Sequence, residues 1–346
     1  MVVKKDMRSR ERDLLAVFDQ IRRDDKPLRI QGLGNRQRES EIAGTPYVMT
    51  DWNSIVSYEP ADLVVTVGAG MAVSALNELL AAHEQWIPLR VPDGKDDTLG
   101  GAVAAGVDGL WHGGYGPFRD RVLGLRVVTP GLGPIQLGSH VVKNVAGYNV
   151  SRLLIGTRGA LGVITEVTLK VSPRPPMSWT WIWEGDLDTL IQRAESLRTL
   201  AWPWASLSFR FQKGSGIQLR AEWHGRRETI KHLVTTLGAG GPDLPLFSGT
   251  PWRDFDVVLK GAVPRRVMAD FLRRVDDGLW VVEWQSGRLF GTASRSQSGR
   301  IGEWIRQQGG VLEVLSGPHV GLSTARVLPE AWQRLKAVYD PEGILG

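Results

Sequence analysis

Residues 91–106 read VPDGKDDTLGGAVAAG, and the fold expected for the surrounding chain follows from this stretch. Thr98 is a residue type that often precedes a helix, because its hydroxyl oxygen can accept a hydrogen bond from an amide of the first turn. The residues after it, Leu99 to Ala105, predict a helix with almost no side-chain bulk on that turn. Free amides and the positive helix end would then face outward together, as in a diphosphate site. A helix packed tightly against the rest of the chain is an equal alternative.

A second glycine-containing stretch lies upstream, RIQGLGNRQ at residues 29–37, in which a short strand predicted at 28–31 runs into Gly32 and Gly34. Glycine permits a positive φ and carries no Cβ, so backbone amides at such a turn can crowd around an anion. Taken alone, two glycines more often make only a turn. The presence of both stretches in one chain favours an anion site.

The third stretch is VVKNVAGYNVSRLLIGTRGALGVITEVTLKV at residues 141–171. Gly156, Gly159 and Gly162 bracket a tight turn before a strand predicted at 163–170, where the backbone could approach a flat ring closely. Four polar residues in apolar surroundings are candidates either for catalysis or for buried structural contacts: Lys143, Asn144, Tyr148 and Asn149.

Other well-known site patterns are incomplete. VGAGMAV at residues 67–73 follows a predicted strand, but Val73 replaces the third glycine of a dinucleotide fingerprint and no acidic residue closes the next strand. The chain has no cysteine, and its six histidines form no ligand-spaced pair, so we predict no metal site. These patterns disfavour a Rossmann NAD enzyme, a metalloenzyme and a serine hydrolase.

Charge and hydropathy exclude further classes. Lys and Arg number 42 against 37 Asp and Glu, a net charge of +5 without a long run of one sign, which predicts a solvated surface and no nucleic-acid partner. No stretch is long and apolar enough for a transmembrane segment, and the N-terminus does not resemble a secretion signal. We therefore expect a cytoplasmic protein.

Composition divides the chain into regions. Glycine is concentrated between residues 94 and 162, tryptophan is concentrated in the second half, and three prolines lie between residues 173 and 176. Prolines there hold the chain extended, as an interdomain connection requires. We predict an N-terminal helical segment at 1–26, a domain at 27–175 made of two small α/β units, and an α+β domain at 176–346. The tryptophans are expected to be packing residues.

The three glycine stretches, in this order and spacing, resemble the PCMH-type FAD-binding domain of the vanillyl-alcohol oxidase family. Further pieces match: VGAGM at 67–71, YGPFRDRVLGLRVV at 115–128 and the closing YDPEGILG at 339–346. The resemblance implies an α+β fold, in which a PCMH-type FAD-binding domain of two α/β subdomains precedes a smaller α+β cap domain. The C-terminus would return to the FAD domain.

The resemblance also implies which residues contact the cofactor. The FAD would be non-covalent, because Asn35 occupies the position of the linking histidine of some members and cysteine is absent. Gly162 and Ile164 would lie on the adenosine side. The full set of implied cofactor contacts is Gly32, Gly34, Asn35, Pro92, Thr98, Leu99, Gly100, Gly101, Gly106, Gly162 and Ile164.

Within this family the chain is most similar to the FAD-linked subunits of bacterial glycolate oxidase. Members that oxidise 2-hydroxy acids alone carry a histidine-containing cap segment, and that segment is absent here. His319 lies in the C-terminal part with no second histidine beside it. The resemblance thus implies a subunit that carries electrons from the oxidation of glycolate, a small 2-hydroxy acid, to glyoxylate. Its partners would be a catalytic flavoprotein subunit and an iron–sulfur subunit, and membrane association would come only through them. The catalytic residues are unknown.

Two alternatives stay open. In the first alternative, the chain is a stand-alone FAD-dependent oxidase or dehydrogenase of a small hydroxy acid, with Lys143, Tyr148 or Asn149 beside the flavin. In the second alternative, the chain is a subunit that has lost FAD and serves as a structural scaffold.

Overall fold

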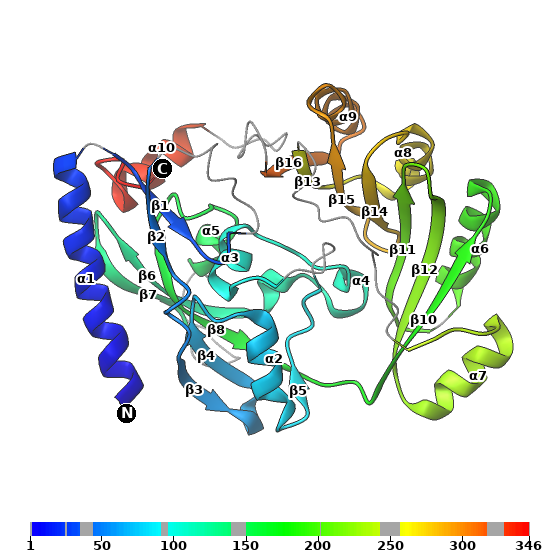
Figure 1. Ribbon diagram of the computed structural model, residues 1–346, viewed down its shortest axis with the longest axis horizontal. Helices are drawn as coiled ribbons and strands as arrows, with labels where there is room; N and C mark the ends of the chain where they lie inside the picture. Colours follow the sequence, from blue (N-terminus) through cyan, green and yellow to red (C-terminus); the bar gives the residue numbers. More distant parts are fainter. Residues whose placement is uncertain are drawn as a thin grey trace.

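The computed structural model describes residues 2–24, 26–34, 44–90, 96–139, 150–200, 202–242, 257–316 and 329–345. These residues form two parts that lie side by side, each with an antiparallel sheet (Figure 1). Each part has its own hydrophobic core. We call the part that contains both chain ends the first part and the other the second part.

A five-stranded sheet in the order β3–β4–β8–β6–β7 organises the first part. Its strands are β3 (Ile55–Glu59), β4 (Val64–Gly68), β8 (Val163–Lys170), β6 (Val122–Thr129) and β7 (Gly133–Gly138). Seven of the eight residues of β8 are buried, because β8 is the middle strand and helices pack on the sheet.

Helices and short strand pairs surround this sheet. The helices are α1 (Val2–Asp24), α2 (Val73–Ala81), α3 (Leu99–Ala104), α4 (His112–Tyr115), α5 (Ser151–Leu154) and α10 (Pro329–Tyr339). The strand pairs are β1 (Leu28–Gln31) with β2 (Thr45–Val48), and β5 (Gln85–Trp86) with β9 (Ser172–Pro173). The end of the chain returns to β1, where the Leu28 amide donates to the Ile344 carbonyl at 2.6 Å.

Helix α1 packs into the same core through Leu14 and Phe18, which are fully buried. Its buried face also carries Glu11, whose side chain is only 3% exposed. Arg126 of β6 donates to Glu11 Oε2 at 2.7 Å, and the Thr165 hydroxyl donates to Oε1 at 3.2 Å. A buried ion pair therefore ties α1 to the sheet.

The second part contains a seven-stranded antiparallel sheet in the order β10–β12–β11–β14–β15–β13–β16. Its strands are β10 (Met177–Glu184), β12 (Gly216–Gly225), β11 (Trp204–Gln212), β14 (Leu279–Glu283), β15 (Arg288–Ala293), β13 (Val257–Ala262) and β16 (Val311–Ser316). Its helices are α6 (Leu187–Thr199), α7 (Arg227–Leu237), α8 (Met268–Arg274) and α9 (Arg295–Gln307).

Tryptophans fill the core of the second part, as their distribution predicted. Trp181, Trp204 and Trp280 are each at most 2% exposed. The indole N–H of Trp181 donates to the Gly238 carbonyl at 3.0 Å, and that of Trp204 donates to the Leu197 carbonyl at 2.9 Å. Their polar atoms are thus satisfied inside the core.

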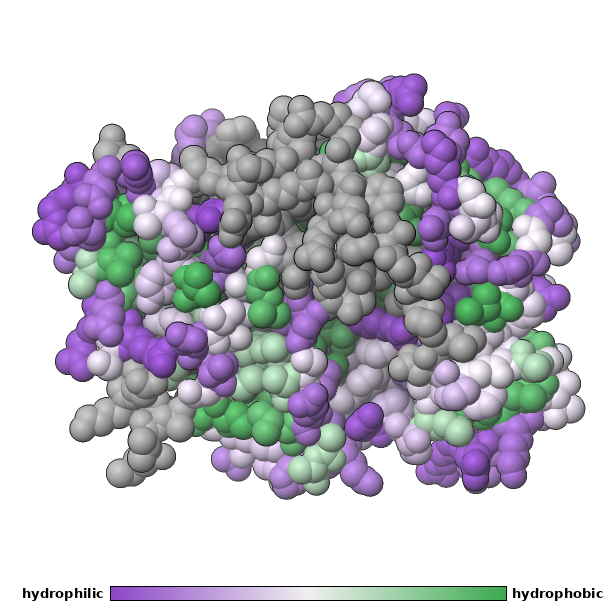
Figure 2. Space-filling view, in the orientation of Figure 1, coloured by the Kyte–Doolittle hydropathy of each residue, from purple (hydrophilic) through white to green (hydrophobic). Residues whose placement is uncertain are grey.

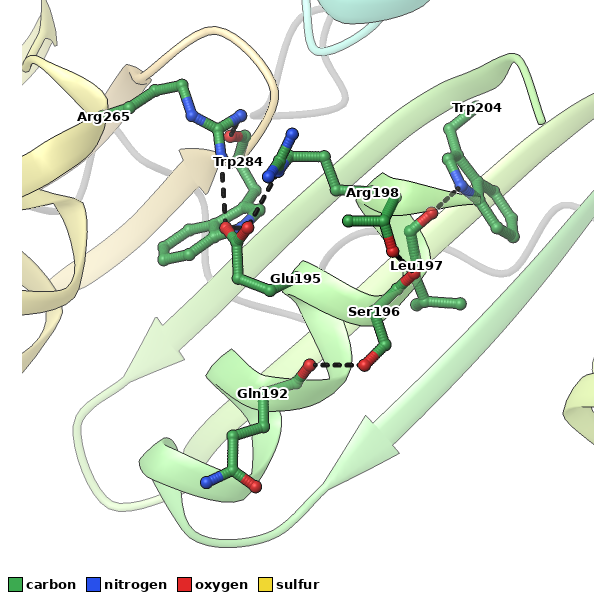
Figure 3. A network of polar contacts seen from close by, with 9 residues as sticks. Gln192, Glu195, Ser196, Leu197, Arg198, Trp204, Arg265 and Trp284 are labelled. Carbon is green, nitrogen blue, oxygen red and sulfur yellow. Dashed lines mark hydrogen bonds and ion pairs between the residues drawn. The ribbon is translucent and has the colours of Figure 1, made fainter. Parts of the chain in front are cut away.

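Helix α6 is tied to its neighbours by the carboxylate of Glu195 (Figure 3). The carboxylate accepts hydrogen bonds from Arg198 at 2.8 Å, from Arg265 at 3.1 Å and from the indole N–H of Trp284 at 2.7 Å. Arg265 and Trp284 lie on segments far from α6 in the sequence, so this network orients α6 on the sheet.

The predicted α+β class is confirmed by this arrangement. Figure 2 shows hydrophilic side chains over much of the visible surface, interrupted by separate hydrophobic spots. Across the described ranges, no helix is both long and apolar enough to cross a membrane. The domain boundaries at residues 27 and 175 stay a prediction.

Candidate cofactor site

The first two glycine stretches meet at Thr98. A Cβ added to Gly32 would lie 2.3 Å from the Thr98 hydroxyl oxygen, so Gly32 leaves no room for a side chain. Thr98 precedes α3 as predicted, and its hydroxyl oxygen accepts a hydrogen bond from the Gly101 amide at 3.1 Å. The loop after β1 therefore lies directly against the start of α3.

The third stretch is bonded to the other end of α3. The Gly156 amide donates to the Val103 carbonyl at 3.1 Å, and the Arg158 amide donates to the Ala104 carbonyl at 2.8 Å. A Cβ on Gly159 would lie 3.9 Å from Ile30 of β1. All three stretches are thus brought together around one short helix.

The amides at the start of α3 are not free. The Leu99 amide donates to the Met71 carbonyl at 2.9 Å, and the Gly100 amide donates to the Ala69 carbonyl at 2.7 Å. The Gly101 amide is held by Thr98, as described above. The prediction that these amides face outward is wrong, because the loop after β4 supplies their acceptors.

Free donors lie instead in the loop after β1. Within the described residues, the amides of Gly32, Leu33 and Gly34 donate no hydrogen bond. Gly34 has a φ of +72°, a left-handed conformation that glycine adopts readily. Successive amides at such a turn form a concavity that suits an anion. We call these three residues, with Thr98 and Gly101, the anion cradle.

Gly101 contributes an open face to the anion cradle. A Cβ at this position would meet only the Thr98 hydroxyl oxygen, at 2.8 Å. A Cβ on Gly100 would instead lie 2.7 Å from the Ala69 Cβ and 2.9 Å from its carbonyl oxygen. The two neighbouring glycines therefore have different roles, since Gly100 allows packing and Gly101 leaves a surface bare.

Gly106 lies beyond the far end of α3. Its φ is +58°, and a Cβ there would lie 3.1 Å from the Gly156 Cα and 3.6 Å from the Lys260 ammonium nitrogen. At 1.5 Å per residue, the six residues of α3 separate this position from the anion cradle by roughly 9 Å. The two predicted contact regions therefore occupy opposite ends of one helix.

Several predicted contact residues serve packing in the structure. Leu99 is fully buried, and Ile164 is 7% exposed on β8. A Cβ on Gly162 would lie 2.5 Å from a methyl group of Val127. Any contact of these residues with the cofactor stays a prediction. Seven residues named from the sequence lie outside the described residues: Asn35, Pro92, Lys143, Asn144, Tyr148, Asn149 and His319.

The incomplete dinucleotide fingerprint is also explained by packing. A Cβ on Gly68 would lie 2.2 Å from the Trp52 carbonyl oxygen, and one on Gly70 would lie 1.8 Å from that of Met49. The lack of a side chain at these glycines lets the backbone of residues 49–52 pack against them, so they do not form a nucleotide site.

A polar cluster that the sequence did not reveal joins the two parts. Glu222 of β12 is 2% exposed and accepts hydrogen bonds from Arg90 at 3.1 Å and from His224 Nε2 at 3.0 Å. The other ring nitrogen of His224 lies 2.8 Å from the hydroxyl of Tyr115 on α4. With Nε2 protonated, Nδ1 accepts from Tyr115. The chain of bonds therefore crosses from one part to the other.

The pKa values in this cluster follow from its burial and its charges. Burial alone would raise the pKa of Glu222, but the hydrogen bond from His224 and the charges of Arg90 and Arg220 outweigh it and lower the pKa to about 2. Burial, together with the charge of Glu222, raises the pKa of Tyr115 to about 12. Glu222 is consequently ionised and Tyr115 protonated at neutral pH.

We expect Glu222 to make the protein acid-sensitive. Its pKa in the folded state is lowered from 4.5, so its stabilising contribution is complete above pH 4.5 and is lost as the pH falls towards 2. The loss amounts to about 3 kcal/mol at most. Denaturant unfolding at pH 5 and at pH 2.5 should show a smaller drop in stability for Glu222→Gln than for the unmodified protein. The exposed Glu184→Gln is the control, and equal drops in all three proteins would contradict the assignment.

Comparison with known proteins adds to this geometry. A family model described as an FAD binding domain matches residues 9–138. The glycolate oxidase subunit GlcE of Escherichia coli (strain K12) is 30% identical over 344 residues, which cover 96% of this chain and 94% of that protein. The D-lactate dehydrogenase of Anaerostipes hadrus is 38% identical over 134 residues, 38% of this chain and 28% of that protein.

Two further likenesses concern a second glycolate oxidase subunit and the fold. The glycolate oxidase subunit GlcD of Bacillus subtilis (strain 168) is 32% identical over 123 residues, 36% of this chain and 26% of that protein. A solved structure of alkyldihydroxyacetonephosphate synthase superposes with a TM-score of 0.65 at 14% identity, covering 96% of this chain and 73% of the other. At that identity the likeness is one of fold alone, and it extends over both parts.

Proposed function

Because the chain belongs to the GlcE family of FAD-linked oxidase subunits, we propose that it is the FAD-binding subunit of a complex that oxidises glycolate to glyoxylate. The resemblance to FAD-linked oxidases, the FAD cofactor and the oxidoreductase class are confirmed by the relatives. The substrate and the assembly are the proposal.

The anion cradle is the observation that supports this function most directly. FAD carries a negatively charged diphosphate, which requires donors without bulky side chains around them. Among the described residues, the amides of Gly32, Leu33 and Gly34 have no acceptor and could supply such donors, and the Thr98 hydroxyl lies beside Gly32. When bound, FAD supplies the electron-transfer chemistry, while the protein holds and orients it. We further propose that FAD is bound non-covalently.

Other subunits complete the proposed complex. The relatives GlcE and GlcD are both named as subunits of glycolate oxidase, which supports a multi-subunit assembly. A GlcD-like flavoprotein would be the catalytic partner. An iron–sulfur cluster would require a third subunit, because this chain has no cysteine to bind one. We place the complex in the cytoplasm, with any membrane contact made through the partner subunits.

Anaerobic flavin reduction tests this function. The chain purified alone should contain FAD, and its absorbance near 450 nm should fall slowly after glycolate is added. Addition of the GlcD-like and iron–sulfur subunits should accelerate reduction by more than about 100-fold, the contribution expected of a general base supplied by the catalytic partner. Rapid reduction of the isolated chain would indicate a stand-alone oxidase instead. A colourless chain that takes up no FAD would contradict the proposal.

A further inference from the structure

A lysine from the second part closes the end of α3. Lys260 of β13 donates from its ammonium group to the Ala105 carbonyl, and to the Gly106 carbonyl at 3.2 Å. The last carbonyls of a helix lack partners within the helix, and a positive charge there is favourable. The Lys260 side chain is only 16% exposed, so this contact is shielded from water.

Two further residues hold Lys260 in place. Glu313 of β16 lies 3.1 Å from the Lys260 ammonium through one carboxylate oxygen, and 2.7 Å from Arg158 through the other. Arg158 also donates to the Val314 carbonyl at 2.6 Å. The three charged groups therefore form a fixed cluster between the parts.

The backbone of Arg158 shows that this cluster is specifically supported. Arg158 has a φ of +56°, a left-handed conformation that costs a residue with a Cβ roughly 1–2 kcal/mol. Such a conformation persists only where surrounding contacts determine it. Here the amide of Arg158 bonds to α3 through Ala104, and its guanidinium bonds to the second part.

The ammonium of Lys260 stands beside a surface that lacks side chains. It lies 3.6 Å from the position of a Cβ on Gly106, and a Cβ on Gly156 would meet nothing within 4 Å. This bare surface is at the opposite end of α3 from the anion cradle. A cofactor whose diphosphate occupies the anion cradle would extend along α3 towards it.

We infer that Lys260 is a positioning residue for the redox-active end of FAD. It fixes the Gly106 end of α3 against the second part, and it places a positive charge there. The inference rests on the proposed FAD binding. A positive charge beside a group that gains electrons raises the reduction potential of that group, so Lys260 is also expected to raise the potential of the bound flavin.

Three lysine variants test the inference in the full-length chain. FAD is removed, its dissociation constant is measured by fluorescence titration, and the midpoint potential of the reloaded flavin is measured by dye equilibration. Lys260→Met should raise the dissociation constant of oxidised FAD about tenfold and that of reduced FAD about 100-fold. The additional tenfold loss for the reduced form lowers the two-electron midpoint potential by about 30 mV. Lys260→Arg, which keeps the charge and the donors, should stay close to the unmodified protein. Lys213→Met, at a lysine that is 69% exposed, is the control and should change neither value.

A fourth variant keeps the test decisive if Lys260→Met does not fold. Glu313→Gln removes the negative partner and leaves the ammonium, so it should raise the potential. Unchanged affinity and potential in Lys260→Met, or an unchanged or lowered potential in Glu313→Gln, would overturn the inference. FAD binding by the unmodified protein is measured before that of any variant. Failure of the unmodified protein to bind FAD would contradict the proposed function itself.

Discussion

Replacement of Gly101 by leucine is expected to give a folded protein that purifies without flavin. The new side chain would start in the anion cradle, where only the Thr98 hydroxyl oxygen lies within 4 Å of the added Cβ. Leucine is a good helix former. The Thr98 hydroxyl must turn away from the new Cβ, which costs α3 one capping hydrogen bond, about 1 kcal/mol, and leaves the protein folded. The diphosphate would lose two or more charge-assisted hydrogen bonds of about 1.5–3 kcal/mol each, which weakens FAD binding by on the order of 100-fold or more.

The measurement is the ratio of flavin to protein absorbance after purification, followed by FAD titration of the variant. Gly299→Leu is the control for a leucine placed at a helical glycine, because Gly299 lies in α9 and a Cβ there meets nothing within 4 Å. Gly100→Leu should behave differently and lose the fold, since its side chain would collide with Ala69. A Gly101→Leu protein that is yellow and binds FAD normally would show that the anion cradle does not bind the FAD diphosphate.

Replacement of Glu11 by alanine is expected to lower the free energy of unfolding by about 3–5 kcal/mol. The change leaves Arg126, whose side chain is 12% exposed, without its buried partner. Loss of one member of a buried ion pair costs more than the pair contributes, because the remaining charge stays desolvated. Urea denaturation followed by circular dichroism measures the loss.

Two comparisons isolate the ion pair. Asp13→Ala alters an exposed acid of the same helix, so it should change stability by less than about 0.5 kcal/mol. The double variant Glu11→Leu with Arg126→Met removes both charges and should recover much of the stability. If Glu11→Ala unfolds at the same urea concentration as Asp13→Ala, α1 is not held by this pair.

The elements that the sequence predicted well are those with a local signal of their own. The strands predicted at residues 28–31 and 163–170 are β1 and β8, and the helix predicted after Thr98 is α3. Strand β15 and helix α9 were missed because glycine interrupts both patterns. In β15, Gly291 faces Trp280 on the next strand, and a Cβ there would lie 2.1 Å from the indole ring. A neighbouring strand supplies the bulk that the local sequence lacks.

The candidate site was predictable in its location and not in its chemistry. Glycine spacing and the N-cap Thr98 correctly indicated that three stretches would meet near one helix. The sequence could not show that the carbonyls of Met71 and Ala69 accept hydrogen bonds from the first amides of α3, because these carbonyls belong to the loop after β4. The contact between Lys260 and Ala105 joins residues 155 positions apart, and no local pattern encodes such a pairing.

The bond between Leu28 and Ile344 determines the order in which the protein can be completed during translation. A ribosome that adds about 5–20 residues per second needs roughly 15 to 60 seconds to travel from the first of these residues to the second. Throughout that interval β1 lacks a neighbour that the finished molecule gives it. The first part therefore has all its strands, β1 to β9, before the second part has any, but it receives α10 and the Ile344 contact only after the whole second part has been synthesised.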